Sequence, residues 1–78
     1  MHELTIQFIG PVRRPGSERT LTIDPTGLQT VGDLLGRLGY SGEERQALHV
    51  LVDGTRRPLE GVIEGADRVE ILVAIGGG

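Results

Sequence analysis

The sequence predicts an α+β fold in which one main helix packs on one face of a mixed β-sheet. Two observations carry this prediction: apolar residues alternate with polar ones near both ends of the chain, and one amphipathic helical stripe lies between them. With 78 residues and no cysteine, the chain is long enough for one small domain that no disulfide or thiolate-bound zinc stabilises. Its stability must therefore come from packing.

Two β-favouring segments near the N-terminus predict a hairpin. Apolar residues alternate with polar ones from Leu4 to Phe8, which is typical of a strand with one buried face. A second such segment covers residues 19–24, with Leu21 and Ile23 as its apolar residues. The stretch between them contains two prolines and two glycines, so we expect a long loop instead of a tight turn.

An amphipathic helix is predicted in the middle of the chain. Its apolar stripe follows the i, i+3, i+4, i+7 spacing and consists of Val31, Leu34, Leu35 and Leu38. Thr30 is a natural N-cap, Asp33 places a negative charge in the first turn, and Gly39 is positioned to end the helix. Residues 41–44 have the spacing of a capping box, so one or two further helical turns are expected over residues 43–48.

The C-terminal half predicts two further strands. Residues 49–52 run into the turn Asp53–Gly54, because this pair supplies the positive φ that such turns need. Pro58 excludes a central strand at its own position. The last strand, residues 69–75, is apolar on one face and half apolar on the other, which suits the middle of a sheet. A right-handed crossover places it parallel to the first strand, so the order of elements predicts a ubiquitin-like, β-grasp roll.

Charge and composition exclude several classes of function. The 11 acidic and 8 basic residues give a net charge of −3, so the chain lacks the positive field that a nucleic-acid surface needs. No apolar run approaches the roughly 18 residues of a membrane helix, and the N-terminus carries no targeting signal, so we expect a cytoplasmic protein. With one Phe, one Tyr and one Met, few large side chains can line a substrate cavity.

Catalytic and metal-binding patterns are missing from the sequence. There is no lysine for a phosphate-binding P-loop and no cysteine nucleophile. His2 and His49 are far apart, with no carboxylate cluster of metal-ligand spacing, so each is interpreted as structural. All 8 basic residues are arginines. We therefore expect no bound metal, no bound cofactor and a protein that is not itself an enzyme.

The C-terminal glycines are the candidate reactive segment. Gly76, Gly77 and Gly78 lack a Cβ atom, so they can extend through a slot too narrow for any side chain. A partner that adenylates the Gly78 carboxylate with ATP would make an acyl-adenylate, which sulfide, a thiolate or an amine can attack. We interpret residues 1–75 as the folded domain and residues 76–78 as a flexible tail. An inert, frayed terminus is the alternative interpretation.

Five segments spread along the chain match the motifs of one protein family. In order they are the strand Thr5–Pro11, the helix start Thr30–Leu35, the turn Val52–Gly54, the stretch Gly65–Ile71 and the Gly-Gly end. Together they resemble the ThiS/MoaD family of ubiquitin-like sulfur carrier proteins over essentially the whole chain. The resemblance implies that a cognate activating enzyme adenylates Gly78 with ATP and that Gly78 becomes a C-terminal thiocarboxylate.

The resemblance also implies a sulfur acceptor and a second partner. In the family, the sulfur goes to the dithiolene of molybdopterin, with a larger molybdopterin synthase subunit, or to the thiazole of thiamin, with a thiazole synthase. The chain length and the segment Gly10–Arg14 are more similar to the molybdopterin branch. The ending at residues 73–78 is more similar to the thiamin branch, so both acceptors stay open.

Two further hypotheses come from other functional classes. One is a protein modifier that is joined through Gly78 to lysines of target proteins. Because the chain has no lysine, its activated terminus cannot react with an ε-amine of another copy, which suits either a carrier or a modifier that forms no lysine-linked chains. The other hypothesis is a plain β-grasp interaction domain with an inert tail.

A partner-binding region is predicted around the tail. Gly77 and Gly76 would thread into the partner's slot, with Ile75 and Ala74 as a hydrophobic threshold. One helix covers only one face of the sheet, so residues on the open face are candidates for a docking patch. These candidates are Leu72, Ala74 and whichever of Phe8, Val50 and Val52 lie on that face. Candidates for electrostatic complementarity near the tail are Arg13, Arg14, Arg56 and Arg57.

Overall fold

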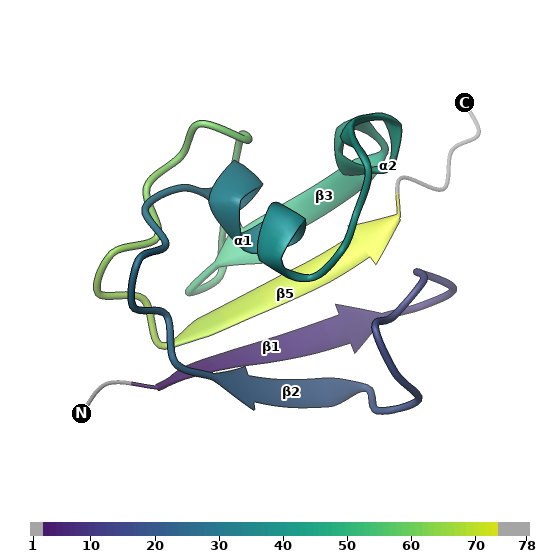
Figure 1. Ribbon diagram of the computed structural model, residues 1–78, viewed down its shortest axis with the longest axis horizontal. Coiled ribbons are helices and arrows are strands. Elements are labelled where there is room, and N and C mark those ends of the chain that lie inside the picture. The colour runs from purple at the N-terminus through teal and green to yellow at the C-terminus, as the bar shows by residue number, and fades with distance from the viewer. Residues whose placement is uncertain (1–2, 74–78) are drawn as a thin grey trace.

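The computed structural model describes residues 3–73, which form a five-stranded mixed sheet with α1 packed across one face (Figure 1). The strands are β1 (Leu4–Ile9), β2 (Thr20–Ile23), β3 (Leu48–Val52), β4 (Thr55–Arg57) and β5 (Arg68–Val73). The helices are α1 (Val31–Arg37) and α2 (Gly42–Gln46). The strand order is β2-β1-β5-β3-β4. This arrangement confirms the predicted α+β roll with one main helix on one face of the sheet.

The last strand occupies the centre of the sheet, as its apolar character predicts. β5 pairs in parallel with β1 and antiparallel with β3. The N-terminal hairpin is also confirmed, because β1 and β2 pair antiparallel, with Leu4 opposite Ile23. β4 is a short edge strand that ends immediately before Pro58, which has no N–H to donate to a sheet ladder.

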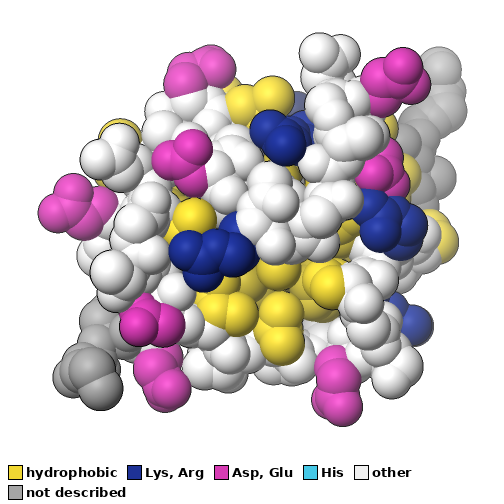
Figure 2. All heavy atoms as spheres, in the orientation of Figure 1, with side chains coloured by type: hydrophobic (Ala, Val, Ile, Leu, Met, Phe, Trp, Pro, Cys, Tyr) yellow, Lys and Arg dark blue, Asp and Glu magenta, His cyan; other side chains and the backbone are white. Residues whose placement is uncertain are grey.

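The hydrophobic core lies between α1 and the sheet. Along β1, β3 and β5, every second side chain is apolar and points toward the helix. The buried strand residues of the core include Leu4, Ile6, Phe8, Val50, Val52, Val69 and Ile71. From α1, Val31, Leu34 and Leu35 are fully buried against them. Because α1 has only 7 residues, it leaves part of this face uncovered, and apolar side chains stay visible between α1 and β2 (Figure 2).

None of the three core-strand residues proposed for the open face lies on it. Phe8, Val50 and Val52 are only 2%, 2% and 6% exposed. Phe8 and Val50 both stand opposite Ile71, so their side chains share its face and pack under α1. All three therefore belong to the core, and none of them meets the condition for a place in the docking patch.

The start of α1 is fixed by the predicted cap. The Thr30 hydroxyl accepts the N–H of Asp33 at 3.1 Å, and the Asp33 carboxylate accepts the N–H groups of Gln29 and Thr30, each at 3.1 Å. These backbone hydrogen bonds hold the pKa of Asp33 below its usual value. Gly39, with φ of +92°, follows the helix as expected of a glycine that ends it.

Removing this cap is expected to lower stability without changing the fold. Thr30→Ala leaves the Asp33 N–H without its side-chain acceptor and should cost about 1 kcal/mol of unfolding free energy. Urea denaturation measures the loss. Thr30→Ser keeps the hydroxyl and serves as the control; an equal loss in the serine variant would show that the methyl group, not the cap, matters.

The second helix is shorter than predicted. The Ser41 capping box is present, with Glu44 as its acidic member, but α2 ends at Gln46 and Leu48 begins β3. Leu48 stands opposite Val73 of β5, so strand pairing with a segment distant in the sequence ends the helix. At the other end of β3 the predicted turn is confirmed, since Asp53 and Gly54 both have positive φ, +49° and +87°.

Candidate functional site

The predicted reactive segment follows the central strand. Ala74, Ile75, Gly76, Gly77 and Gly78 lie outside the described residues, so their roles stay predictions. β5 ends at Val73 between β1 and β3. Figure 1 shows the ends of β1 and β5 and the start of β3 near α2 at the same end of the sheet. Residues from three strands therefore surround the point from which the tail continues.

An apolar patch lies on the open face next to this point. Leu72 stands opposite Ile9 of β1 on one side and opposite His49 of β3 on the other, so the three side chains form a row across the sheet. Leu51, two residues after His49, lies on the same face. We call Ile9, His49, Leu51 and Leu72 the open-face patch. Ile9 is 36% exposed and the other three are half-buried.

The open face becomes polar away from Val73. Arg68 and Glu70 of β5 form an ion pair at 3.7 Å, and Thr5 of β1 stands opposite Arg68. The apolar part of this face is thus concentrated toward the end where the tail continues. Leu72 is the one sequence-predicted member of the patch that the structure describes. Sequence reasoning did not identify the other three members, Ile9, His49 and Leu51. For Ile9 a signal was present, because the alternation of the strand places the residue after Phe8 on the face away from the core.

A small groove lies on the helix side of the same end. It has a volume of about 140 Å³, and its mostly apolar lining includes Val12, Tyr40, Ala47, Leu48 and Val73. We call it the tail-root groove. Val12 comes from the β1–β2 loop and is only 5% exposed, so this loop is folded back against the domain.

Arg13 holds the loop in this position. Its Nε and one terminal nitrogen donate to the two carboxylate oxygens of Glu44, at 2.6 and 2.8 Å, and the same terminal nitrogen donates to the Gly39 carbonyl at 3.0 Å. The guanidinium lies 5.0 Å from the centroid of the Tyr40 ring, and the Tyr40 hydroxyl donates to the Arg13 carbonyl. One arginine therefore joins the β1–β2 loop to α2 and to the segment that precedes it.

This contact predicts a specific acid sensitivity. The bidentate Arg13 guanidinium, with the Ser41 N–H, lowers the pKa of Glu44 from 4.5 to about 2. Because the folded pKa lies below the unfolded one, Glu44 contributes stability above pH 4.5 and loses it as the pH falls toward about 2. Glu44→Gln should therefore flatten the fall of stability across this window, measured by denaturation at a series of pH values.

A neighbour in the same helix supplies the control for this measurement. Glu43 is exposed and forms no ion pair within residues 3–73. Glu43→Gln removes the same charge and should leave the acid profile close to that of the wild type. Asp24 and Asp33, whose pKa values are also lowered, are unchanged in both variants. If both glutamine variants shift the profile equally, the effect belongs to net charge and not to the Arg13 contact.

The four arginines suggested for the tail region do not gather there. Arg13 lies at the tail-root groove, paired with Glu44. Arg14 follows it in the same loop and is half-buried. Arg56 and Arg57 belong to β4, which is separated from β5 by the whole of β3. The structure thus divides them between two sides of the molecule.

Within residues 3–73, there is no group of three or more His, Cys, Asp and Glu side chains that could hold a metal ion. None of the helices in the described part of the chain is long and apolar enough to cross a membrane.

The strand order and the helix across one face of the sheet define a ubiquitin-like fold. The model of the ThiS family matches residues 6–78, and the chain belongs to this family. The members of this family are small sulfur carrier proteins, which are not enzymes themselves. Among curated protein sequences, none matches the chain significantly.

Solved structures with the same fold include two ubiquitin-like relatives. A crystal structure of small archaeal modifier protein 1 from Haloferax volcanii is 17% identical, with a TM-score of 0.73 over 96% of this chain and 100% of that one. The complex of subunits 1 and 2 of molybdopterin-converting factor from Helicobacter pylori 26695 contains a chain that is 16% identical, with a TM-score of 0.62 over 97% of this chain and 99% of that chain. Both likenesses confirm the β-grasp fold.

Proposed function

We propose that this protein is a sulfur carrier whose Gly78 carboxylate is adenylated and then converted to a thiocarboxylate. The observation that carries the proposal is the ThiS-family match, which continues through the glycine tail to residue 78. The position of β5 adds support, because its last residue, Val73, lines the tail-root groove and directly follows Leu72 of the open-face patch. ATP-dependent activation would take place in the cytoplasm.

The proposed reaction has two steps on the terminal carboxyl group. A carboxylate oxygen of Gly78 attacks the α-phosphate of ATP, which releases pyrophosphate and leaves an acyl-adenylate. Hydrosulfide, or a donor at the same oxidation level, then attacks the acyl carbon and displaces AMP. The product is a thiocarboxylate whose sulfur is available for transfer. ATP is a substrate of the activating enzyme, so the carrier itself needs no bound cofactor.

Docking to the activating enzyme would use both surfaces near Val73. The open-face patch offers apolar contact area beside the tail, and the glycines have no side chain to obstruct a narrow channel. Ile75 and Ala74 would contact the entrance of that channel. The tail-root groove can accept one apolar side chain of the partner from the helix side.

The sulfur acceptor is either the dithiolene of molybdopterin or the thiazole of thiamin. The segment Gly10–Arg14 favours the molybdopterin branch, while the ending at residues 73–78 favours the thiamin branch. The corresponding partners are a molybdopterin synthase large subunit and a thiazole synthase. Incubation of the thiocarboxylate form with each synthase and its precursor distinguishes the two acceptors. Only the synthase and precursor of the correct pathway should consume the thiocarboxylate.

Protein modification through Gly78 is the second candidate function. It is favoured by the likeness in fold to small archaeal modifier protein 1, which covers 96% of this chain. In that case an ε-amine of a target lysine, instead of hydrosulfide, attacks the same acyl-adenylate and forms an isopeptide.

Mass spectrometry of the C-terminal peptide tests the proposal. The last arginine is Arg68, so trypsin releases residues 69–78 as one peptide after incubation with ATP, the activating enzyme and a sulfur source. Exchange of one oxygen for sulfur on this peptide is the expected result. A branched peptide that joins Gly78 to a target lysine would identify a modifier instead. If the peptide is unchanged and no ATP–pyrophosphate exchange occurs, the protein would be identified as an interaction domain with an inert tail.

A further inference from the structure

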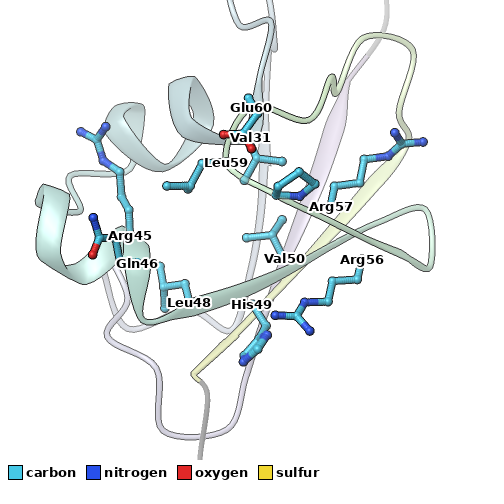
Figure 3. Close-up of a pocket in the computed structure, with 11 residues that line it drawn as sticks. Val31, Arg45, Gln46, Leu48, His49, Val50, Arg56, Arg57, Leu59 and Glu60 are labelled. Atoms are coloured by element: carbon cyan, nitrogen blue, oxygen red, sulfur yellow. The ribbon is translucent and has the colours of Figure 1, made fainter.

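A larger groove lies at the β4 edge of the sheet, and His49 of the open-face patch is one of its lining residues. Its volume is about 530 Å³ (Figure 3). The floor is apolar and consists of Val31, Leu48, Val50, Pro58 and Leu59, while the rim carries Arg45, Arg56 and Arg57. We call it the β4 groove.

Leu48, Pro58 and Leu59 keep part of their surface exposed in the groove because β4 is too short to cover them, whereas Val31 and Val50 lie buried beneath. β4 pairs only with Val50, Leu51 and Val52 of β3, and Pro58 then takes the chain out of the sheet. On this side, the Leu48–His49 end of β3 has no neighbouring strand among the described residues. An extended segment can therefore lie along this end of β3 without displacing any part of the sheet.

The opposite wall is fixed by α1. The N–H of Gly32 donates to the Leu59 carbonyl at 2.8 Å, and the N–H of Val31 donates to the Gly61 carbonyl at 2.9 Å. A Cβ atom at Gly32 would come within 3.3 Å of the Leu59 carbonyl oxygen, so the helix and this segment are in close contact. The groove is thus a preformed feature of the fold.

The rim is positively charged in a chain whose net charge is −3. Arg45, Arg56 and Arg57 face one carboxylate on the lining, that of Glu60. The ion pairs within residues 3–73 are formed by Arg13 and Arg68, so none of the three rim arginines has a carboxylate partner there. Arg45 uses its Nε to donate to the Tyr40 carbonyl at 3.0 Å, which leaves its terminal nitrogens for another acceptor.

The positions of these arginines select among anionic ligands. Figure 3 shows Arg45 on the α2 side of the groove and Arg56 and Arg57 on the β4 side. Arg57 stands opposite Val50 and lies on the helix side of the sheet, whereas Arg56 stands opposite Leu51 and lies on the open face, which also carries His49. The apolar side chains of the floor offer a phosphate no hydrogen bonds. A peptide with an apolar side chain between carboxylates matches both features, because guanidinium groups bind carboxylates in bidentate geometry.

We propose that the β4 groove binds an extended acidic segment of a partner protein. One apolar side chain of that segment packs on Leu48 and Leu59. Carboxylates on either side pair with Arg45 at one end of the groove and, at the other end, with Arg57 on the helix side and Arg56 on the open face. This binding does not depend on chemistry at Gly78, so it can succeed or fail independently of the proposed carrier function.

Peptide titration of the full chain, followed by backbone amide NMR shifts, tests the proposal. The probe is a peptide with one leucine between two runs of glutamate. We expect shifts concentrated in residues 45–60. Arg56→Gln combined with Arg57→Gln should weaken binding between about two-fold and thirty-fold, as expected for two exposed charge pairs. Both side chains are exposed, so the variant should fold normally.

A charge-matched variant and two control ligands make the test specific. Arg14→Gln combined with Arg19→Gln removes the same charge from the β1–β2 loop and should leave peptide binding unchanged. A peptide with glutamine in place of every glutamate should bind weakly. Three outcomes would overturn the proposal. The glutamine peptide could bind as tightly as the glutamate peptide, or both double arginine variants could lose the same amount of affinity. Inorganic phosphate could also cause the same NMR shifts with the same affinity as the peptide.

Discussion

Gly77→Ala is expected to abolish adenylation of Gly78 while the domain stays folded. The proposed activation needs residues 76–78 to pass through a channel that admits backbone but no side chain, and one methyl group is enough to obstruct such a channel. ATP–pyrophosphate exchange with the activating enzyme measures the reaction directly. An NMR spectrum of the variant should overlay that of the wild type for residues 3–73.

A second glycine provides the matched control. Gly42 is the first residue of α2, and a Cβ atom built there meets nothing within 4 Å. Gly42→Ala adds the same methyl group on the folded domain and should leave exchange activity unchanged. Normal exchange with Gly77→Ala would show that the channel tolerates a side chain and would remove the reason for a glycine at this position.

Local sequence patterns predicted most of the fold because its elements carry their own start and stop signals. Thr30 and Asp33 fix the start of α1 through side chains within one turn, and Asp53–Gly54 forms its turn from two residues alone. The end of α2 is different. It depends on Leu48 pairing with Val73, 25 residues further along the chain, and no local pattern contains that information.

The same distinction separates the predicted parts of the site from the missed ones. A terminal run of glycines and a family resemblance are readable in the sequence, and so is the apolar Leu72. Which residues surround Leu72 depends on the register of β5 with β1 and β3, which brings together Ile9 and His49. The Arg13–Glu44 contact joins residues 31 positions apart and likewise exists only in the folded chain.

Leu72→Arg is expected to weaken docking to the activating enzyme strongly without unfolding the protein. Leu72 is half-buried in the centre of the open-face patch, where an interface would remove it from water. Truncating such central residues costs about 2 kcal/mol or more, and a buried unpaired charge adds to this loss. The KM for the carrier in ATP–pyrophosphate exchange should therefore rise by about thirty-fold or more.

The effect of Leu72→Arg should depend on position and not on charge alone. Thr22 of β2 is exposed on the same face, paired opposite Thr5 at the polar end. Thr22→Arg adds the same charge there and should leave the KM close to that of the wild type. If Leu72→Arg also kept the wild-type KM, the open face would not be the docking surface. The activating enzyme would then hold the carrier through the tail and the tail-root groove, where Val73 provides the contact with the folded domain.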